Sequence, residues 1–298
     1  MATETAKKMT PAQREAAREA RTAKVEQMQA DLTAAVEALT ESGQWQRWLD
    51  HLASFHRYSF NNTLLILVQC PHATQVAGFK AWQDKGRQVR KGEKAIRIFG
   101  KPFRLVSDTD ETTGEKTRKA IPCPPPVVSV FDISQTDPIE GVDQPAIPVA
   151  QLEGEDHAAL YARTAAWITS QGWTVAREEI PGTTNGFCTV DGTKRIVVEA
   201  TLSDAHAAKT LIHETAHAIL HTDDAGKLTT DPDQATRELE AESVAYVVAG
   251  LHDLDTSDYS VGYVASWSDG QAELIKATAV RVLEAVHRIA DALDATND

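Results

Sequence analysis

Long apolar runs are missing from this sequence of 298 residues. The longest, Leu64–Val68, is far shorter than the about 20 apolar residues that a membrane-spanning helix needs. The first residues lead into alternating alanine and charge, without the apolar core and cleavage site that direct export. We therefore expect a cytoplasmic protein with no membrane partner.

Cysteine is also scarce, and the three cysteines (Cys70, Cys123 and Cys188) lie far apart. An odd number at wide spacing indicates neither a disulfide framework nor a cysteine-based zinc site. The chain nevertheless has the 42% hydrophobic and 24% charged residues of a folded protein. Its length exceeds what one compact core usually organises, so we expect two domains.

The acidic excess of the chain is not spread evenly. The net charge is −13, which by itself argues against nucleic acid as a partner. Residues 43–104, however, hold eleven Lys or Arg against three acids, which gives +8 and leaves −21 for the rest. A basic module therefore lies within an acidic protein, and the charge of each domain is the relevant measure.

Patterning predicts an α+β fold with an N-terminal domain at residues 1–136, a linker at 137–152 and a C-terminal domain at 153–298. Eight of the twelve prolines fall between Pro102 and Pro148, on both sides of a polar loop expected at Ser107–Lys119. The first half is expected to contain helices at 11–40, Trp45–Phe55 and Asn61–Gln69, and strands at Ala95–Phe99 and Val127–Phe131.

The second half is expected to run from a helix at Asp156–Ser170 to a strand at Trp173–Arg177 and then a hairpin. Asp191-Gly192 forms the turn between the hairpin strands, Phe187–Val190 and Arg195–Glu199. Three further helices are expected near 204–221, 232–249 and 270–293, the first capped by Ser203 and the second by Asp231 with Pro232 in its first turn.

The clearest chemical motif is His213-Glu214-Thr215-Ala216-His217. Histidines four residues apart lie one turn along the same helix face, so both imidazoles can converge on one cation. Glu214 lies about 60° around the helix axis from His217, which is too far for it to be a natural ligand of the same cation. It can instead act as the base that takes a proton from a water that zinc makes acidic.

A catalytic zinc site needs a third protein ligand, and the helix expected at 232–249 offers carboxylates. Glu238 and Glu242 lie one turn apart on a face with Ala241 and Ala245, whose small side chains allow helices to approach closely. We predict Glu238 as the ligand and Glu242 as the carboxylate that orients a ligating histidine. The reverse assignment stays open.

Glu240 and His221 lie near these candidates but are not predicted to be metal ligands. Glu240 points away from the Glu238 face and is expected to be solvated. His221 is expected to be a helix-end residue, with a place behind a metal ligand as the alternative.

HETAH, followed by a helix that bears E-x-x-A-E, resembles the gluzincin metallopeptidases, especially the ImmA/IrrE type. The resemblance implies peptide hydrolysis by a zinc enzyme with one Zn²⁺ per chain, acting on an unknown protein substrate. It also implies that Arg195–Glu199 is the edge strand that pairs with substrate. Tyr246, Tyr259 and Tyr263 are the candidates for stabilising the oxyanion, and a buried tyrosine is the commoner role of each.

In the basic module, aromatic residues alternate with cations, a composition suited to single-stranded nucleic acid. Stacking on bases and contact with phosphates are its expected roles, and a solvated basic face is the alternative. The candidates of the densest part are Trp82, Lys85, Arg87, Arg90, Lys91 and Lys94.

The segments Tyr58-Ser59-Phe60-Asn61-Asn62, Gly78-Phe79 and Gly86–Glu93 resemble the N-terminal domain of ArdC-type antirestriction proteins. That family joins a domain that binds single-stranded DNA to an ImmA/IrrE-like zinc metallopeptidase domain, typically on mobile genetic elements. The resemblance adds Tyr58, Asn61 and Asn62 as candidate DNA contacts, and its register also matches Glu238 to the ligand position.

The sequence thus predicts a zinc metallopeptidase that binds single-stranded DNA and protects incoming DNA from restriction. A protein that coats single strands or blocks a nuclease, with the metal site as scaffold, is the alternative. A metal-dependent hydrolase that acts on the nucleic acid is a third interpretation. The oligomeric state is not predicted.

Overall fold

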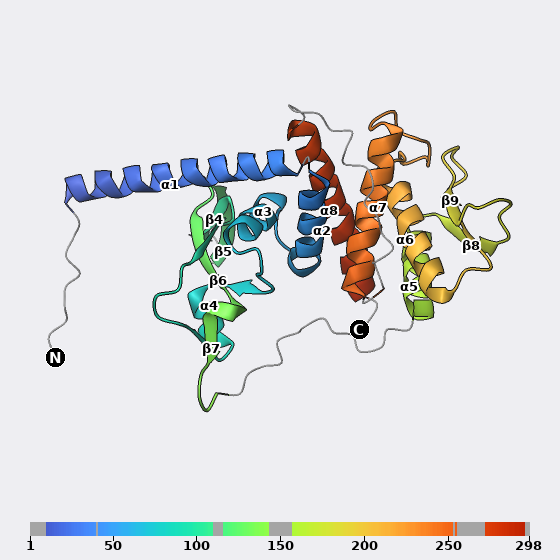
Figure 1. Cartoon of the computed structure of the whole chain (residues 1–298). Coiled ribbons are helices and arrows are strands. Elements are labelled where there is room, and N and C mark those ends of the chain that lie inside the picture. The colour runs from blue at the N-terminus through green and yellow to red at the C-terminus, as the bar shows by residue number, and fades with distance from the viewer. Residues whose placement is uncertain are drawn as a thin grey trace.

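The computed structural model describes residues 10–39, 41–109, 116–142, 157–252, 254 and 272–295. The first element is the long helix α1 (Pro11–Ala38), much of which extends away from the body of the protein (Figure 1). Thr10 caps it, because its hydroxyl accepts the N–H of Gln13 while the Gln13 side chain accepts the N–H of Thr10. The helix expected at 11–40 is confirmed.

A mixed helix and strand region follows. Its helices are α2 (Ser42–Phe55), α3 (Phe60–Gln69), α4 (Phe79–Asp84) and the 3₁₀ turn η1 (Ile133–Gln135). Its strands are β1 (Val76–Ala77), β2 (Arg87–Val89), β3 (Ile96–Phe99), β4 (Phe103–Thr109), β5 (Lys116–Pro122), β6 (Val127–Asp132) and β7 (Thr136–Pro138). They form one sheet of order β1-β6-β3 and two ribbons, β2-β7 and β4-β5, all antiparallel.

Helix α3 covers the β1-β6-β3 sheet and fixes its edge strand. Ile66 of α3 packs with Ile96, Ile98 and Val130 in a small buried core. The Asn62 side chain both accepts the N–H and donates to the carbonyl of Phe99 at 2.9 Å. The helix therefore anchors β3 by polar contacts as well as by apolar packing.

Two predictions for this region need correction. The stretch Ser107–Lys119, expected to be a polar loop, pairs as β4 and β5 out to Thr109 and Lys116. Cross-strand hydrogen bonds outweigh the polar composition there, while residues 110–115 lie outside the described residues. Residues 136–138, at the start of the predicted linker, form β7, and 143–156 are not described.

The second region contains the expected helices and strands. They are α5 (His157–Ser170), β8 (Thr174–Glu178), β9 (Gly186–Cys188), β10 (Arg195–Glu199), α6 (Asp204–Leu220), α7 (Gln234–Leu251) and α8 (Ala272–Asp294). The sheet order is β8-β10-β9, with β10 parallel to β8 and antiparallel to β9. Arg195–Glu199 was expected at the edge, but Ile196, Val197 and Val198 are fully buried and β10 is the central strand.

The start of α7 also differs from the prediction. Asp233, not Asp231, caps this helix, because its carboxylate accepts the N–H of Thr236 at 3.0 Å. Pro232 lies outside the helix, and its carbonyl accepts a bond from the Arg237 guanidinium.

The largest hydrophobic core takes side chains from both halves of the sequence. Helix α2 packs against α7 and inserts Trp45 and Trp48, both without exposed surface, into this core. The indole N–H of Trp45 donates to the Ser243 hydroxyl of α7 at 3.0 Å. The two domains of this α+β architecture therefore meet in a continuous helical core, and the predicted boundaries at 136 and 153 stay a prediction.

Within the described part of the chain, no helix combines the length and the apolar composition required to cross a membrane.

Candidate metal centre and basic face

Helix α6 presents both histidines of the HETAH motif on one face. Ser203 caps the helix, as expected, by accepting the N–H of His206. Leu211 and Ile212 are fully buried and fix the rotation of the helix against the core. His213 and His217 consequently lie side by side, facing α7.

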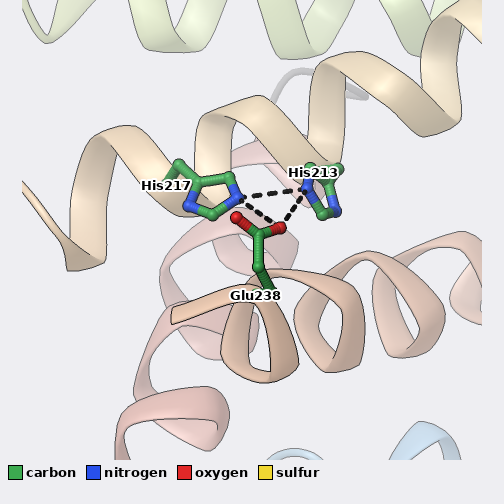
Figure 2. A group of neighbouring side chains, drawn as sticks. All are labelled: His213, His217 and Glu238. Atoms are coloured by element: carbon green, nitrogen blue, oxygen red, sulfur yellow. Dashed lines mark hydrogen bonds and ion pairs between the residues drawn. The ribbon is translucent and has the colours of Figure 1, made fainter. Parts of the chain in front are cut away.

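Three nitrogen and oxygen atoms converge between α6 and α7. The Nε2 atoms of His213 and His217 are 3.1 Å apart, and Oε2 of Glu238 lies 3.7 and 3.5 Å from them. Figure 2 shows the two rings directed toward the carboxylate. Tetrahedral zinc with bonds of about 2 Å holds neighbouring ligand atoms about 3.3 Å apart. The donor set and its spacing therefore suit a zinc ion.

Glu242 lies behind His213. Its Oε2 is 3.2 Å from Nδ1 of that ring, which leaves Nε2 turned toward His217 and Glu238. Burial lowers the pKa of His213, but the bond to Glu242 and the charges of three nearby carboxylates outweigh it, so the pKa is raised. The His217 ring, whose Nε2 lies 3.5 Å from Oε2 of Glu238, lowers the pKa of that carboxyl. The site is thus rich in negative charge that suits a cation.

Glu214 is buried at the wall of the same site. Burial raises the pKa of its carboxyl to about 7, and the backbone N–H of Cys188 in β9 donates to it. Together with His213 and Glu242 it lines an open cleft of about 570 Å³. A group that titrates near neutrality beside a cleft can accept and release protons.

Strand β9 reaches Glu214 because residue 186 is glycine. A Cβ at that position would lie 2.6 Å from Cγ2 of Thr210 and 3.3 Å from Cγ of Glu214. Any side chain there would push β9 away from α6. Sequence reasoning missed Gly186, because a close approach between two segments leaves no mark in the sequence beyond the glycine itself.

Two residues behind His217 are buried, of which Glu240 was misjudged and His221 takes the place that was kept as its alternative. Glu240, expected to be solvated, has no exposed surface and bonds to His221 and Arg281. His221, expected at a helix end, does cap α6, but its ring is also buried and lies 3.0 Å from Nδ1 of His217. The prediction assumed that the face of α7 bearing Glu240 is exposed to solvent, whereas α8 covers it.

The tyrosine candidates are not assigned to the site. The hydroxyl of Tyr246 donates to Asp50 of α2 at 2.6 Å, so it is directed toward the N-terminal region. Tyr259 and Tyr263 lie outside the described residues.

Two of the predicted DNA contacts have structural roles in the fold. Trp82 has no exposed surface and its indole N–H donates to the carbonyl of Phe131, so its ring cannot stack on a base. Asn62 is buried and spends its amide on the backbone of Phe99. Burial excludes the Trp82 ring from stacking on a base, which aromatic spacing alone could not show, whereas Asn62, 9% exposed, still lines a groove and stays a prediction.

Four of the remaining candidates line two depressions. Tyr58 and Asn61 line a groove of about 770 Å³ between α1 and α3, together with Arg57 and Lys101. Arg90 and Lys91 line a hollow of about 690 Å³ with Phe79, which is 46% exposed.

The cations differ in how far the fold already engages them. Arg87 donates to Thr136 in the β2-β7 ribbon, and Arg90 pairs with Glu93 and Asp137. Lys85 lies over the buried Trp82 ring, at 5.6 Å from its centroid. Lys91 and Lys94 are exposed.

Two family models match the chain in the order of its two regions. Residues 22–131 match the N-terminal domain of anti-restriction factor ArdC, and residues 169–252 match the IrrE N-terminal-like domain of the M78 peptidases. The chain is therefore ArdC-like in the kind and the order of its two regions. Both matches confirm the resemblance that the motifs predicted, and the second places α6 and α7 within a metallopeptidase-like domain.

Individual proteins are also similar to this ArdC-like chain. An uncharacterised protein of Bacillus anthracis, pXO2-81, is 30% identical over 250 residues, which are 73% of this chain and 42% of that protein. The chain thus spans less than half the length of that relative. The metal-free crystal structure of antirestriction protein ArdC from plasmid R388 aligns at 19% identity with a TM-score of 0.44, covering 80% of this chain and 83% of that one. The Mn(II)-bound structure gives 19% and 0.42, covering 84% and 94%.

Replacing Gly186 by alanine should separate β9 from α6. We expect G186A to lower the free energy of unfolding by about 1–3 kcal/mol, because the added methyl overlaps Thr210 and backbone that cannot move freely. Urea unfolding measures the loss. G78A is the matched control, since Gly78 has an ordinary φ and the nearest atom to its Cβ would be 3.9 Å away. Equal stability of the two variants would contradict the close approach.

Proposed function

We propose that this chain is a zinc-dependent metallopeptidase that binds single-stranded DNA and serves an antirestriction role on a mobile genetic element. The observation that carries the proposal is the convergence of His213 Nε2, His217 Nε2 and Glu238 Oε2 at zinc-like spacing. The M78 peptidase match over the same helices supports the enzyme class, and the match to the ArdC N-terminal domain supports the antirestriction role.

His213, His217 and Glu238 would hold one zinc ion, and Glu242 would fix the His213 ring. Zinc bound there supplies Lewis-acid chemistry, which polarises a peptide carbonyl and makes water a better acid. Glu214 takes the proton from the attacking water and later delivers it to the leaving amine. Its buried carboxyl suits both roles, because a pKa of about 7 allows it to change protonation state at neutral pH.

The substrate would be a protein segment in extended conformation. Strand β9 pairs with β10 on one side only, and the N–H of Cys188 points from its other side toward Glu214. An extended peptide can add to such an edge and bring one of its carbonyls to the cleft. This assigns to β9 the substrate-pairing role that was first expected of β10.

The DNA-binding role is supported by the charge of +8 over residues 43–104 in an otherwise acidic chain. The exposed ring of Phe79 offers a stacking surface in place of the buried Trp82. Lys91 lines the same hollow and supplies charge for phosphates.

Metal analysis tests the site directly. The wild-type chain should bind about one zinc ion, and H213A or E238A should lose most of it, because two ligands rarely hold zinc. The zinc stoichiometry is measured by elemental analysis after dialysis has removed unbound zinc. H206A is the control on the same helix, since His206 lies outside the convergent group. Equal zinc in H213A and the wild type would remove the site from consideration.

Glu214→Gln separates binding from catalysis. We expect E214Q to keep zinc but to lose at least about 100-fold in peptidase rate, because the amide cannot accept the proton from water. A casein digest followed by mass spectrometry of the products measures the activity.

E214Q also distinguishes the proposed peptidase from a protein that only coats single strands, because a coating protein would protect DNA without proteolysis. Transfer of an unmodified plasmid into a restricting host should fall with E214Q to the level without the protein. Full protection by E214Q would favour strand coating over proteolysis.

Fluorescence titration with a labelled oligonucleotide tests the basic face. Affinity should fall steeply with salt, because cations that contact phosphates release counterions. F79A should weaken binding by about 1–3 kcal/mol, the value of one base stacked on an aromatic ring. F187A is the control, since Phe187 is also exposed but lies in β9. A DNA affinity that changes neither with salt nor with F79A would contradict the assignment of DNA binding to this surface.

A further inference from the structure

A buried polar cluster behind His217 takes no part in the function proposed above. It joins His221 at the end of α6, Glu240 in α7 and Arg281 in α8. The side chains of His221 and Glu240 are 1% and 0% exposed, and that of Arg281 is 29% exposed. Buried charged groups are costly, so a cluster of this kind needs a reason beyond stability.

The cluster forms an unbroken series of contacts that ends at a predicted metal ligand. Nδ1 of His217 lies 3.0 Å from Nδ1 of His221, and Nε2 of His221 lies 2.9 Å from Oε2 of Glu240. The other oxygen of Glu240 accepts the Nε–H of Arg281 at 2.6 Å. The series starts at Arg281. Its guanidinium can only donate hydrogen bonds, since it has no acceptor atom.

Hydrogen-bond bookkeeping then fixes each proton. A carboxylate paired with Arg281 is an acceptor, so the bond from His221 to Glu240 requires a proton on Nε2 of His221. Nδ1 of His221 consequently carries a lone pair and accepts from His217, whose own proton sits on Nδ1. The lone pair of His217 is therefore on Nε2, the atom that faces His213 and Glu238.

We propose that His221, Glu240 and Arg281 are positioning residues that hold His217 in the tautomer and orientation required to bind the metal. The inference rests on the metal site of the proposed function. It also explains an asymmetry, because His213 bonds directly to a carboxylate, Glu242, while His217 reaches its carboxylate through a second imidazole. None of the three residues touches the metal or the substrate in this assignment.

Zinc affinity, measured by competition with a chromophoric chelator on the full chain, tests the proposal. We expect H221F and E240Q to bind zinc 10- to 100-fold more weakly than the wild type, the usual cost of losing a partner behind a ligating histidine. E284Q is the control, because Glu284 is an exposed glutamate one turn away from Arg281 on α8. Circular dichroism and thermal unfolding of the metal-free proteins report whether each variant folds.

If H221F or E240Q fails to fold, R281M takes its place, since Arg281 is partly exposed and its removal leaves the His221–Glu240 contact standing. We expect R281M to weaken zinc binding in the same direction. Folded variants with the affinity of the wild type would overturn the proposal.

Histidine tautomers provide a readout that a purely structural role would not move. Two-bond ¹H–¹⁵N spectra of the zinc-loaded chain should show His217 protonated on Nδ1 and His221 protonated on Nε2. A proton on Nδ1 of His221 would refute the assignment. A wild-type chain that binds no zinc would overturn the proposed function and this inference together, whereas unchanged zinc binding in the variants would overturn this inference alone.

Discussion

The close packing of α6 against α7 is the constraint on which the candidate site depends. Ala216 of α6 and Ala241 and Ala245 of α7 have no exposed surface in the shared core. Small side chains let the two backbones approach, so that a glutamate of one helix reaches the histidines of the other. Larger residues at these positions would separate Glu238 from His213 and His217 and dissolve the convergent donor group.

The same packing explains why so many polar groups are buried around the site. Each imidazole has one nitrogen for the convergent centre and one that must find another partner. Glu242 serves His213, and the cluster of His221, Glu240 and Arg281 serves His217. Helix α8 is thereby part of the site, although none of its residues lies among the three converging ligand atoms.

The two regions of the chain pack against each other through a shared core. Helix α2 places Trp45 and Trp48 in the core that α7 and α8 share, and Trp45 bonds to Ser243, the neighbour of Glu242. Arg90 and Lys91 of the basic module line a hollow beside α4, together with the exposed ring of Phe79. One helical core therefore supports both a candidate metal centre and a candidate nucleic-acid surface.

The helices and strands of the second region, the HETAH motif and the choice of Glu238 over Glu240 as ligand candidate could be predicted from the sequence, because they depend on local periodicity and on capping. Burial could not, since it depends on which elements cover which faces. The fold encloses Trp82, which looked like a stacking platform, and Glu240, which looked solvated. It also puts β10 inside its sheet. Contacts between segments far apart in the chain decided each of these, and no local pattern records them.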